Sequence, residues 1–346
     1  MANDLVLLTG ATGYLGYLTL IALLKRGYKV RAAVRSNSKV SKIEAAPSFK
    51  ALKPSVEWVI VPDMTADGAY DEAVKGVKYI VHVASPIPTF GTEAIPTEKL
   101  EEYFLHQAPK GELGMLTSAH KAGTVKRIVV TSSVVAIVPF EYYMGEGDYS
   151  KVIPASNRIP DVTGPFVAEF QAYSAGKAKA INASEAWMES HDTIFDLISV
   201  IPGWIFGQDE LVSSVEDFTK GSTNSVLLNL LLGNKEENGY NGNVVSGEDV
   251  AQLQVLALDP SIKGNQSFIA SIDAEWEDAI AIVKKEYPEQ VANGDFSVDG
   301  KQPTFDIKHT WKETEATFAP LGFKFAPFEK IVKAVAKQYL ELKAKA

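Results

Sequence analysis

The sequence predicts an α/β fold of the Rossmann type, a doubly wound parallel sheet with a smaller, mainly C-terminal lobe. Short apolar runs alternate with helical patterns over about the first 200 residues, which is typical of βαβ units. A glycine-rich turn between Gly10 and Gly16 follows the first apolar run and begins the first helix. Hydroxyl side chains end a later run at Thr131, Ser132 and Ser133, where the carboxyl end of a parallel strand faces a ligand crevice.

The apolar runs and the helical patterns give the expected elements in order. The expected strands are Leu5–Thr9, Lys29–Val34, Val56–Val61, Tyr79–Ala84, Arg127–Ser132 and Phe195–Ile201, and the helices between them cover 14–26, 97–122 and 168–190. The third and fourth runs are almost continuously apolar, which predicts strands buried on both faces. After Pro202 we expect a helix at Glu248–Leu258, a strand at Gln266–Ala270 and helices at 274–287 and 327–343.

The bulk composition is that of a soluble globular protein and excludes several function classes. A formal net charge of −9 argues against a nucleic-acid-binding protein, which needs a basic surface. The absence of cysteine excludes disulfides and thiolate-bound metals, and the histidines have no metal-binding spacing. His82, inside an apolar run, is expected to be a core residue with its hydrogen bonds satisfied. No secretory signal is recognisable and glycines interrupt the apolar stretch 5–24, so we expect a cytoplasmic protein without a membrane span.

The turn Thr9-Gly-Ala-Thr-Gly-Tyr-Leu-Gly16 has the position and composition of a dinucleotide-binding loop. Gly10 allows a tight turn, Gly13 lets the backbone approach a pyrophosphate, and Gly16 lets the helix pack closely on the strand. The N-terminus of the helix offers N–H donors to phosphates. A glycine-rich turn without a ligand is the alternative. The residues predicted to bind the dinucleotide here are Thr9, Gly10, Thr12, Gly13, Tyr14, Leu15 and Gly16.

Basic residues after the second strand indicate NADP rather than NAD. An acidic residue at this place would bind a ribose 2′-hydroxyl, but Arg35 and Lys39 stand here and suit a 2′-phosphate. A solvated basic turn is the alternative. After the third strand, Asp63 is expected either to meet the adenine amino group or to cap a helix, and Met64 belongs to the same predicted cofactor contacts.

Tyr173 and Lys177 are the residues most indicative of chemistry. Their spacing of four places both side chains on one face of a helix, where an ammonium lowers the pKa of a neighbouring phenol and prepares it for proton transfer. About one such pair is expected by chance in a chain of this composition, and a second pair, Tyr339 and Lys343, lacks supporting context. Ser133, at the end of the fifth strand, is predicted to donate a hydrogen bond to a substrate carbonyl oxygen.

Together, the glycine loop, the Thr-Ser-Ser strand end and the Tyr173/Lys177 pair resemble the extended short-chain dehydrogenase/reductase superfamily. Further stretches are similar to the fungal NADPH-dependent carbonyl and aldehyde reductases, which are related to plant dihydroflavonol and cinnamoyl-CoA reductases. These stretches are Val81-His-Val-Ala-Ser-Pro86, Val125-Lys-Arg-Ile-Val-Val-Thr-Ser-Ser133, Ile201-Pro-Gly-Trp-Ile-Phe-Gly207 and Leu321-Gly-Phe-Lys-Phe325. The resemblance runs over nearly the whole chain.

The resemblance implies roles for individual residues. The serine matching Ser133 polarises the carbonyl, the tyrosine matching Tyr173 protonates the new alkoxide, and the lysine matching Lys177 holds the nicotinamide ribose. The residues matching Arg35 and Lys39 bind the 2′-phosphate. Further cofactor contacts are expected at Ala84, Ser85, Pro202, Gly203 and Ile205. An apolar substrate pocket is expected from Ile87, Phe90, Val135, Val138, Trp204 and the segment 224–232.

The resemblance also implies two lobes with the substrate between them. We expect residues 1–203 to form the NADP-binding domain, with 243–260 returning to it, and 204–242 and 261–346 to form the substrate-binding lobe. The polar segment 208–243, with an apolar patch at 226–232, is either a lid of loops and a helix or a plain surface excursion. We expect a monomer or a homodimer that acts on a small carbonyl substrate, with neither nucleic acid nor membrane as a partner.

Some positions depart from the family pattern. Gly176 stands where the family usually has serine, Gln208 stands where proline is common, and Gly111-Glu-Leu-Gly114 occupies a region where asparagine is frequent. A glycine at 176 costs about 0.5–1 kcal/mol of helix stability relative to alanine. The missing asparagine leaves the route of the proton relay open.

These observations predict an NADPH-dependent reductase of aldehydes and ketones, in which the carbonyl is held between Ser133 and Tyr173 during hydride transfer. Two alternatives are retained. A nucleotide-sugar epimerase or dehydratase would keep NAD bound, and Arg35 with Lys39 argues against it. A non-catalytic NADP-sensing protein typically loses the tyrosine or the lysine, and both are present here.

Overall fold

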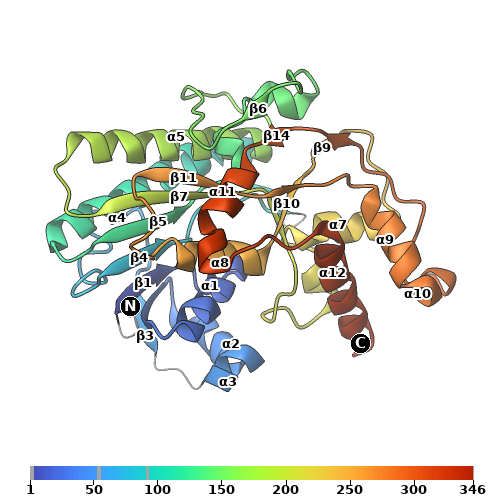
Figure 1. Ribbon diagram of the computed structural model, residues 1–346, viewed down its shortest axis with the longest axis horizontal. Coiled ribbons are helices and arrows are strands. Elements are labelled where there is room, and N and C mark those ends of the chain that lie inside the picture. The colour runs from blue at the N-terminus through green and yellow to red at the C-terminus, as the bar shows by residue number, and fades with distance from the viewer. Residues whose placement is uncertain (1–3, 53–55, 91–92, 346) are drawn as a thin grey trace.

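A parallel sheet of seven strands forms the centre of the structure, a computed structural model that describes residues 4–52, 56–90 and 93–345 (Figure 1). The strand order is β11-β7-β5-β4-β1-β2-β3. The chain reverses its direction of winding between β1 and β4, the switch point at which Rossmann-type sheets bind ligands. The predicted Rossmann-type fold is therefore confirmed. The strands are β1 (Leu5–Thr9), β2 (Lys29–Val34), β3 (Val56–Ile60), β4 (Tyr79–His82), β5 (Arg127–Thr131), β7 (Asp196–Pro202) and β11 (Gln266–Ala270).

Helices cover both faces of this sheet, and small sheets extend from its edge (Figure 1). The helices are α1 (Tyr14–Lys25), α2 (Val40–Ala45), α3 (Pro47–Leu52), α4 (Gln107–Ala122), α5 (Glu169–Ser190), α6 (Val215–Thr219), α7 (Asn224–Leu231), α8 (Gly247–Leu256), α9 (Asp278–Glu286), α10 (Pro288–Ala292), α11 (Trp311–Phe318) and α12 (Phe328–Lys343). Single helical turns are η1 (Asn37–Lys39), η2 (Thr97–Lys99), η3 (Glu101–His106), η4 (Val134–Ala136), η5 (Phe140–Met144) and η6 (Ala319–Leu321). The small sheets pair β8 (Trp204–Phe206), β10 (Asn243–Ser246) and β12 (Ile272–Asp273), β9 (Tyr240–Asn241) with β13 (Thr304–Phe305), and β6 (Val152–Ile153) with β14 (Lys308–His309).

Alternate residues of the inner strands face opposite layers of helices. On β1, Val6 and Leu8 belong to the hydrophobic cluster that contains α1 and α8, whereas Leu7 belongs to the cluster that contains α4. On β5, Val129 faces the first layer and Val130 the second. The two-residue period of a strand produces this division, and burial on both faces explains the continuous apolar runs.

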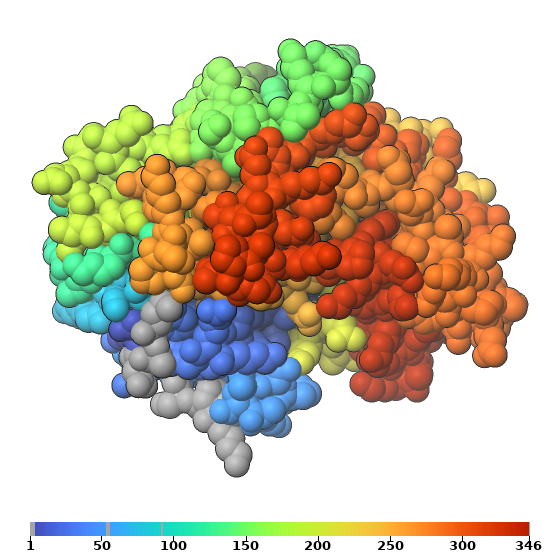
Figure 2. Space-filling view, in the orientation of Figure 1, coloured from blue at the N-terminus to red at the C-terminus, as the bar shows by residue number. Residues whose placement is uncertain are grey.

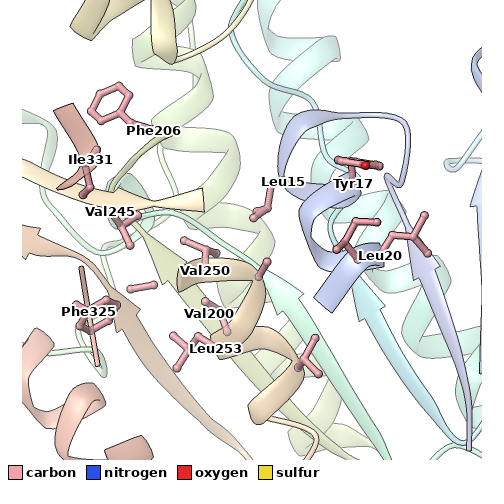
Figure 3. Close-up of a cluster of buried hydrophobic side chains, with 14 of the residues drawn as sticks. Leu15, Tyr17, Leu20, Val200, Phe206, Val245, Val250, Leu253, Phe325 and Ile331 are labelled. Carbon is pink, nitrogen blue, oxygen red and sulfur yellow. The ribbon is translucent and has the colours of Figure 1, made fainter. Parts of the chain in front are cut away.

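The first cluster continues from the sheet into the C-terminal part of the chain (Figure 3). Leu253 of α8 lies between the α1 side chains and those of α12, such as Ile331. Figure 2 shows the C-terminal residues, in orange and red, packed across the face that also exposes the N-terminal residues in blue. One continuous core therefore joins the two halves of the sequence, and burial of its apolar surface is the main force that holds them together.

Most of the expected elements are confirmed, and the edge strand β3 is a correction. Its pattern predicts burial on both faces, but Ile60 is 42% exposed because β3 lies at the edge of the sheet with only β2 as a neighbour. The strand expected to end at Ala84 ends at His82. The backbone N–H groups of Val83 and Ala84 instead donate to the Thr9 hydroxyl at 3.1 and 3.0 Å.

The single helix expected over 97–122 is wrong in its first half. The segment forms a 3₁₀ turn, a π-helical turn over Glu101–His106 and then α4. Pro109 supplies the physical reason, because it has no N–H to donate to the carbonyl of Leu105 and its ring would clash with that carbonyl in a regular helix. A wider π turn absorbs this misfit. The helix expected over 274–287 begins later, at Asp278.

The segment 208–243 is not a plain surface excursion. Its apolar patch forms α7, and Leu227, Leu228 and Leu231 are fully buried in the first hydrophobic cluster. From the region expected to belong to the smaller lobe, β11 pairs with β7 and forms the far edge of the main sheet. The division into two lobes remains a prediction. Within the described residues, no helix is both long and apolar enough to cross a membrane.

A buried chain of polar side chains joins the α1 and α8 layer to the central sheet and gives a testable prediction. Gln254 of α8 accepts a hydrogen bond from Thr19 of α1 at 2.7 Å and donates one to the Thr131 hydroxyl of β5 at 2.6 Å. Gln254→Leu leaves the Thr131 hydroxyl buried without a donor, so we expect the free energy of unfolding to fall by about 1–3 kcal/mol.

Urea unfolding of the two proteins measures this change. The matched control is Gln252→Leu, an exposed position two residues earlier on the same helix, which should change stability by less than about 0.5 kcal/mol. Equal stability of the Gln254→Leu variant and the unmodified protein would show that the chain of hydrogen bonds contributes nothing.

Candidate active site

The Tyr173/Lys177 pair lies on α5 directly over the carboxyl end of β5. Lys177 is 3% exposed, and its ammonium donates a hydrogen bond to the backbone carbonyl of Thr131 at 3.1 Å. Ser133 follows that strand by two residues and begins the turn η4, where its hydroxyl accepts from the N–H of Val135 at 3.4 Å. The three residues that the sequence singled out for chemistry are therefore together.

The hydroxyl of Tyr173 is hydrogen-bonded with Ser133, and its titration differs from the expectation. Burial raises the pKa of Tyr173, and the hydrogen bond with Ser133 offsets only part of this increase. The predicted lowering of the Tyr173 pKa by Lys177 is therefore wrong for this state of the protein. Desolvation of a phenolate outweighs the attraction of a cation that is itself bound to the Thr131 carbonyl. At neutral pH the phenol is protonated and is a hydrogen donor.

Glu112 of α4 is a buried charged residue that the sequence reasoning missed. It is 6% exposed and accepts a hydrogen bond from Ser184 of α5 at 2.9 Å. Burial raises the pKa of Glu112, and the charge of Lys177 lowers it. For Lys177 the signs are reversed: burial lowers its pKa, and the charge of Glu112 raises it. Glu112 lies on the same buried face of α4 as Ala108, Met115 and Ala119. A charged residue in this otherwise apolar helical repeat was the signal in the sequence that could have identified Glu112.

His82 is a neutral core residue near this cation. Its Nδ1 is 3.0 Å from the Thr9 hydroxyl, while its Nε2 is buried and has no partner among the described residues. The expectation that its hydrogen bonds are satisfied is thus only half correct. Burial and the charge of Lys177 lower the pKa of His82 to about 3, so His82 carries no charge at physiological pH.

The glycine at position 176 has a packing reason. A Cβ on Gly176 would lie 2.4 Å from the backbone oxygen of Phe104, which belongs to the π-helical turn η3. The Phe104 ring meets the Tyr173 ring edge-on, with centroids 5.9 Å apart. The serine usual in the family would not fit here, so the departure at Gly176 and the π turn that Pro109 imposes are two parts of one arrangement.

The glycine loop has the shape of a dinucleotide cradle. Gly10 has φ +77°, and a Cβ there would lie 2.9 Å from the backbone nitrogen of Ala84. A Cβ on Gly16 would lie 1.9 Å from the oxygen of Gly10, whereas one on Gly13 would meet only the Gly10 oxygen, at 3.6 Å. Gly13 begins α1 without a side-chain cap, so the N–H donors of the first turn remain available to a phosphate. The Ser85 hydroxyl is buried without a partner among the described residues, as a missing ligand would leave it.

Three predicted cofactor residues, Thr9, Tyr14 and Leu15, have buried side-chain atoms. The Thr9 hydroxyl receives the N–H groups of Val83 and Ala84 and contacts His82, so it ties β1 to the end of β4. The Tyr14 hydroxyl is buried without a hydrogen-bond partner among the described residues, and a Cβ on Gly247 would lie 2.6 Å from it. The Leu15 side chain is part of the core, and Thr12 and Gly13 remain at the accessible tip of the loop.

Arg35 and Lys39 are exposed after β2, and neither forms an ion pair with another described residue. Asp63 forms a tight turn, because its Oδ1 accepts from the N–H and the hydroxyl of Thr65 at 2.8 and 2.7 Å. These two hydrogen bonds lower the pKa of Asp63, and Arg35 is among the cations that lower it further. The Met64 side chain packs on α4, where a Cβ on Gly111 would lie 2.2 Å from its Cε.

Aromatic side chains form a wall beyond the end of β7. Trp204 contacts Phe90 with ring centroids 6.3 Å apart, and its indole N–H donates to Asn241 at 2.8 Å. Phe90 has a positive φ of +44°, a strained value, and its carbonyl accepts from the N–H of Gly221 at 2.9 Å. This contact brings the segment 221–223 to the wall. There, the Thr223 hydroxyl donates to the carbonyl of Ile205.

The remaining predicted pocket and cofactor residues are divided between surface and core. Ile87 is 52% exposed, whereas Val135 and Val138 are buried, Val138 completely. In α7, the leucines belong to the core, and only Asn229 and Val226 are partly exposed. Pro202 ends β7, and Gly203 passes so close to β10 that a Cβ there would lie 2.3 Å from the Asn243 oxygen.

The second pair with the same spacing is a structural feature of α12. Tyr339 packs in the core against Phe296, and Lys343 forms a surface ion pair with Asp295 at 2.5 Å. Neither residue is close to the carboxyl end of the sheet. Tyr339 and Lys343 therefore lack the contacts with Ser133 and β5 that Tyr173 and Lys177 have.

The structure combines a Rossmann-type sheet, a glycine-rich loop at its switch point and the group of Ser133, Tyr173 and Lys177 beside that loop. This combination is typical of proteins that bind a dinucleotide. Residues 6–267 match the NAD dependent epimerase/dehydratase family. Ketoreductase CTB6 of Cercospora beticola is 40% identical over 356 residues, which cover 100% of this chain and 97% of that protein. NAD-dependent epimerase/dehydratase FUM13 of Gibberella moniliformis is 30% identical, with 98% and 96% covered.

The chain belongs to the NAD dependent epimerase/dehydratase family, within the extended short-chain dehydrogenase/reductases, as its motifs predict. Among solved structures, the yeast methylglyoxal/isovaleraldehyde reductase Gre2 complexed with NADPH has a TM-score of 0.80 and 24% identity, covering 99% of this chain and 100% of that chain. Vestitone reductase from alfalfa has a TM-score of 0.71 and 22% identity, covering 99% and 100%. These structures share the fold of the chain.

The close contact between Gly176 and the backbone of Phe104 gives a testable prediction. Gly176→Ala forces the backbone of Phe104 away from α5, so we expect the free energy of unfolding to fall by about 1–3 kcal/mol, as overpacking does. The shift also moves the Phe104 ring on Tyr173. Thermal and urea unfolding measure the stability.

Gly114→Ala is the matched control, because the nearest atom to a Cβ at this helical position is 3.9 Å away. This variant should be more stable than the unmodified protein by about 0.5–1 kcal/mol, since alanine favours a helix over glycine. A Gly176→Ala variant that gains stability in the same way would contradict the packing argument.

Proposed function

We propose that this protein reduces aldehydes and ketones to alcohols with NADPH. The observation that carries the proposal is the hydrogen-bonded pair of Ser133 and Tyr173 beside the buried ammonium of Lys177. All three lie at the carboxyl end of β5, next to the glycine cradle at the switch point of the sheet. The similarity to Ketoreductase CTB6, and to the Gre2 structure complexed with NADPH, supports the type of reaction and the cofactor.

The residues of the cradle fit a dinucleotide, and NADPH supplies the hydride when it is bound there. The N–H donors of the first turn of α1 would hold the pyrophosphate, and Gly10 and Gly13 leave room for it. Arg35 and Lys39 would hold the 2′-phosphate, because both are exposed at the end of β2 and free of ion pairs with described residues. Asp63, Met64, Ala84, Ser85, Pro202, Gly203 and Ile205 complete the proposed cofactor contacts.

Ser133 and Tyr173 would act on the substrate oxygen. Ser133 donates a hydrogen bond that polarises the carbonyl, so its carbon becomes a better hydride acceptor. As negative charge grows on the oxygen, Tyr173 transfers its hydroxyl proton to it, and the alcohol is complete. The raised pKa of Tyr173 keeps this proton on the phenol at neutral pH, which is the state that reduction requires.

Lys177 would hold the ribose of the cofactor and stabilise the phenolate that remains on Tyr173. Its ammonium has three N–H donors, and the Thr131 carbonyl occupies one of them. The aromatic wall of Phe90 and Trp204 would give the substrate an apolar surface, which favours hydrophobic carbonyl compounds.

Removal of the Tyr173 hydroxyl tests the mechanism. Tyr173→Phe should lower kcat for every carbonyl substrate by about 10²–10⁴-fold, the usual contribution of a positioned proton donor, while NADPH still binds. NADPH oxidation and fluorescence titration measure the two effects. Tyr339→Phe, in the pair outside the site, is the control and should keep its activity. Near-normal NADPH oxidation by Tyr173→Phe would refute the mechanism.

Removal of the basic residues after β2 tests the cofactor. The double variant Arg35→Ala with Lys39→Ala should raise KM for NADPH by about 10–100-fold, since hydrogen bonds to a charged group contribute about 1.5–3 kcal/mol. KM for NADH should stay nearly constant, because NADH lacks the 2′-phosphate. Lys29→Ala, an exposed lysine at the opposite end of β2, is the control. A preference of the unmodified enzyme for NADH would refute the assignment.

A further inference from the structure

Tyr143 is a partly buried residue with a buried hydroxyl, and no step above uses it. It lies on the turn η5, which follows Ser133 and η4 along the chain. In Figure 1 the green segment around β6 lies beside α5. The turn η5 contacts α5 itself, because the ring of Tyr143 packs on that of Phe170.

The ring of Tyr143 is fixed against α5 by aromatic contacts. It meets the Phe170 ring edge-on, with centroids 5.2 Å apart and an interplanar angle of 89°. Phe140 contacts both rings, at 6.2 Å from Tyr143 and 6.1 Å from Phe170. Phe170 is three residues before Tyr173 on α5, so these two side chains are neighbours on one face of the helix, and Tyr143 packs against that face through Phe170.

The hydroxyl of Tyr143 has no hydrogen-bond partner among the described residues, although it is buried. Its neighbours in the sequence differ, since Tyr142 donates to the Asp148 carbonyl at 3.1 Å and Tyr149 donates to the Tyr142 carbonyl at 2.7 Å. Burial raises the pKa of Tyr143 well above its ordinary value, and the nearby Tyr173 raises it further. The group is thus a neutral donor at physiological pH. A buried donor without a partner is costly and is usually satisfied by a ligand or a water molecule.

We propose that Tyr143 donates a hydrogen bond to a second oxygen of the substrate, close to the carbonyl held by Ser133 and Tyr173. This inference rests on the proposed function. Tyr143 is then a specificity-determining residue, and the preferred substrates are carbonyl compounds that carry a neighbouring neutral acceptor oxygen, as β-keto esters and β-diketones do. The Tyr143 hydroxyl is buried and its ring packs on the apolar rings of Phe140 and Phe170, so a carboxylate is disfavoured in that place because an anion would lose its hydration there.

A pair of substrates that differ only in the second oxygen tests the proposal. The probes are ethyl acetoacetate and 2-heptanone, and the measured quantity is the ratio of their kcat/KM values with NADPH. We expect Tyr143→Phe to lower this ratio about tenfold, the loss of one hydrogen bond in a dry site. Its melting temperature should not fall, because the variant removes a hydroxyl that has no partner in the free protein. Tyr142→Phe is the matched control and should keep the ratio of the unmodified enzyme while losing stability.

A binding measurement separates the failure of this inference from failure of the proposed function. Acetylacetone, added with NADP⁺, should raise the melting temperature of the unmodified protein and not that of Tyr143→Phe. An equal shift in both proteins, or an unchanged kcat/KM ratio in Tyr143→Phe, would overturn the role of Tyr143. If the unmodified protein oxidises NADPH with neither substrate, the proposed function is wrong, and the melting shift still decides whether Tyr143 binds the second oxygen.

Discussion

The buried ammonium of Lys177 is the constraint on which the arrangement of the site depends. A cation that is 3% exposed needs partners inside the protein, and among the described residues the Thr131 carbonyl and the charge of Glu112 supply them. The carbonyl at the end of β5 is within reach only when one face of α5 lies over that strand. One turn earlier on the same face is Tyr173, which therefore reaches Ser133. The position of one charge thus sets the position of the helix and of the phenol.

The contact between α5 and the π turn is the second constraint, and it explains a departure from the family pattern. Pro109 cannot continue a regular helix, and the wider turn before it brings the Phe104 carbonyl against α5. Only a residue without a Cβ fits at position 176 under these conditions. The loss of helix propensity at Gly176 is about 0.5–1 kcal/mol, which is smaller than the strain that a side chain would introduce there.

Local signals in the sequence were sufficient for the sheet and for the three central residues of the site. The strands of the βαβ units, the glycine turn and the spacing of Tyr173 and Lys177 each depend on a few neighbouring residues, and the structure agrees with them. The contacts that the sequence did not reveal join segments far apart in the chain. The exposed face of β3 follows from its place at the edge of the sheet, and Glu112 becomes a partner of Lys177 only when α4 packs on α5. No periodicity encodes such pairings.

The titration of the site also depends on these long-range contacts, as Tyr173 and His82 show. Spacing alone predicted a phenol acidified by its neighbouring ammonium, but burial dominates and the Tyr173 pKa is raised. His82 is neutral because burial and Lys177 lower its pKa to about 3, so it adds no second cation that could acidify the phenol. A phenol that keeps its proton can give it to an oxygen and cannot accept one. In the proposed mechanism this is the state that reduction requires, whereas oxidation of an alcohol would first require Tyr173 to lose its proton against the cost of burying a phenolate.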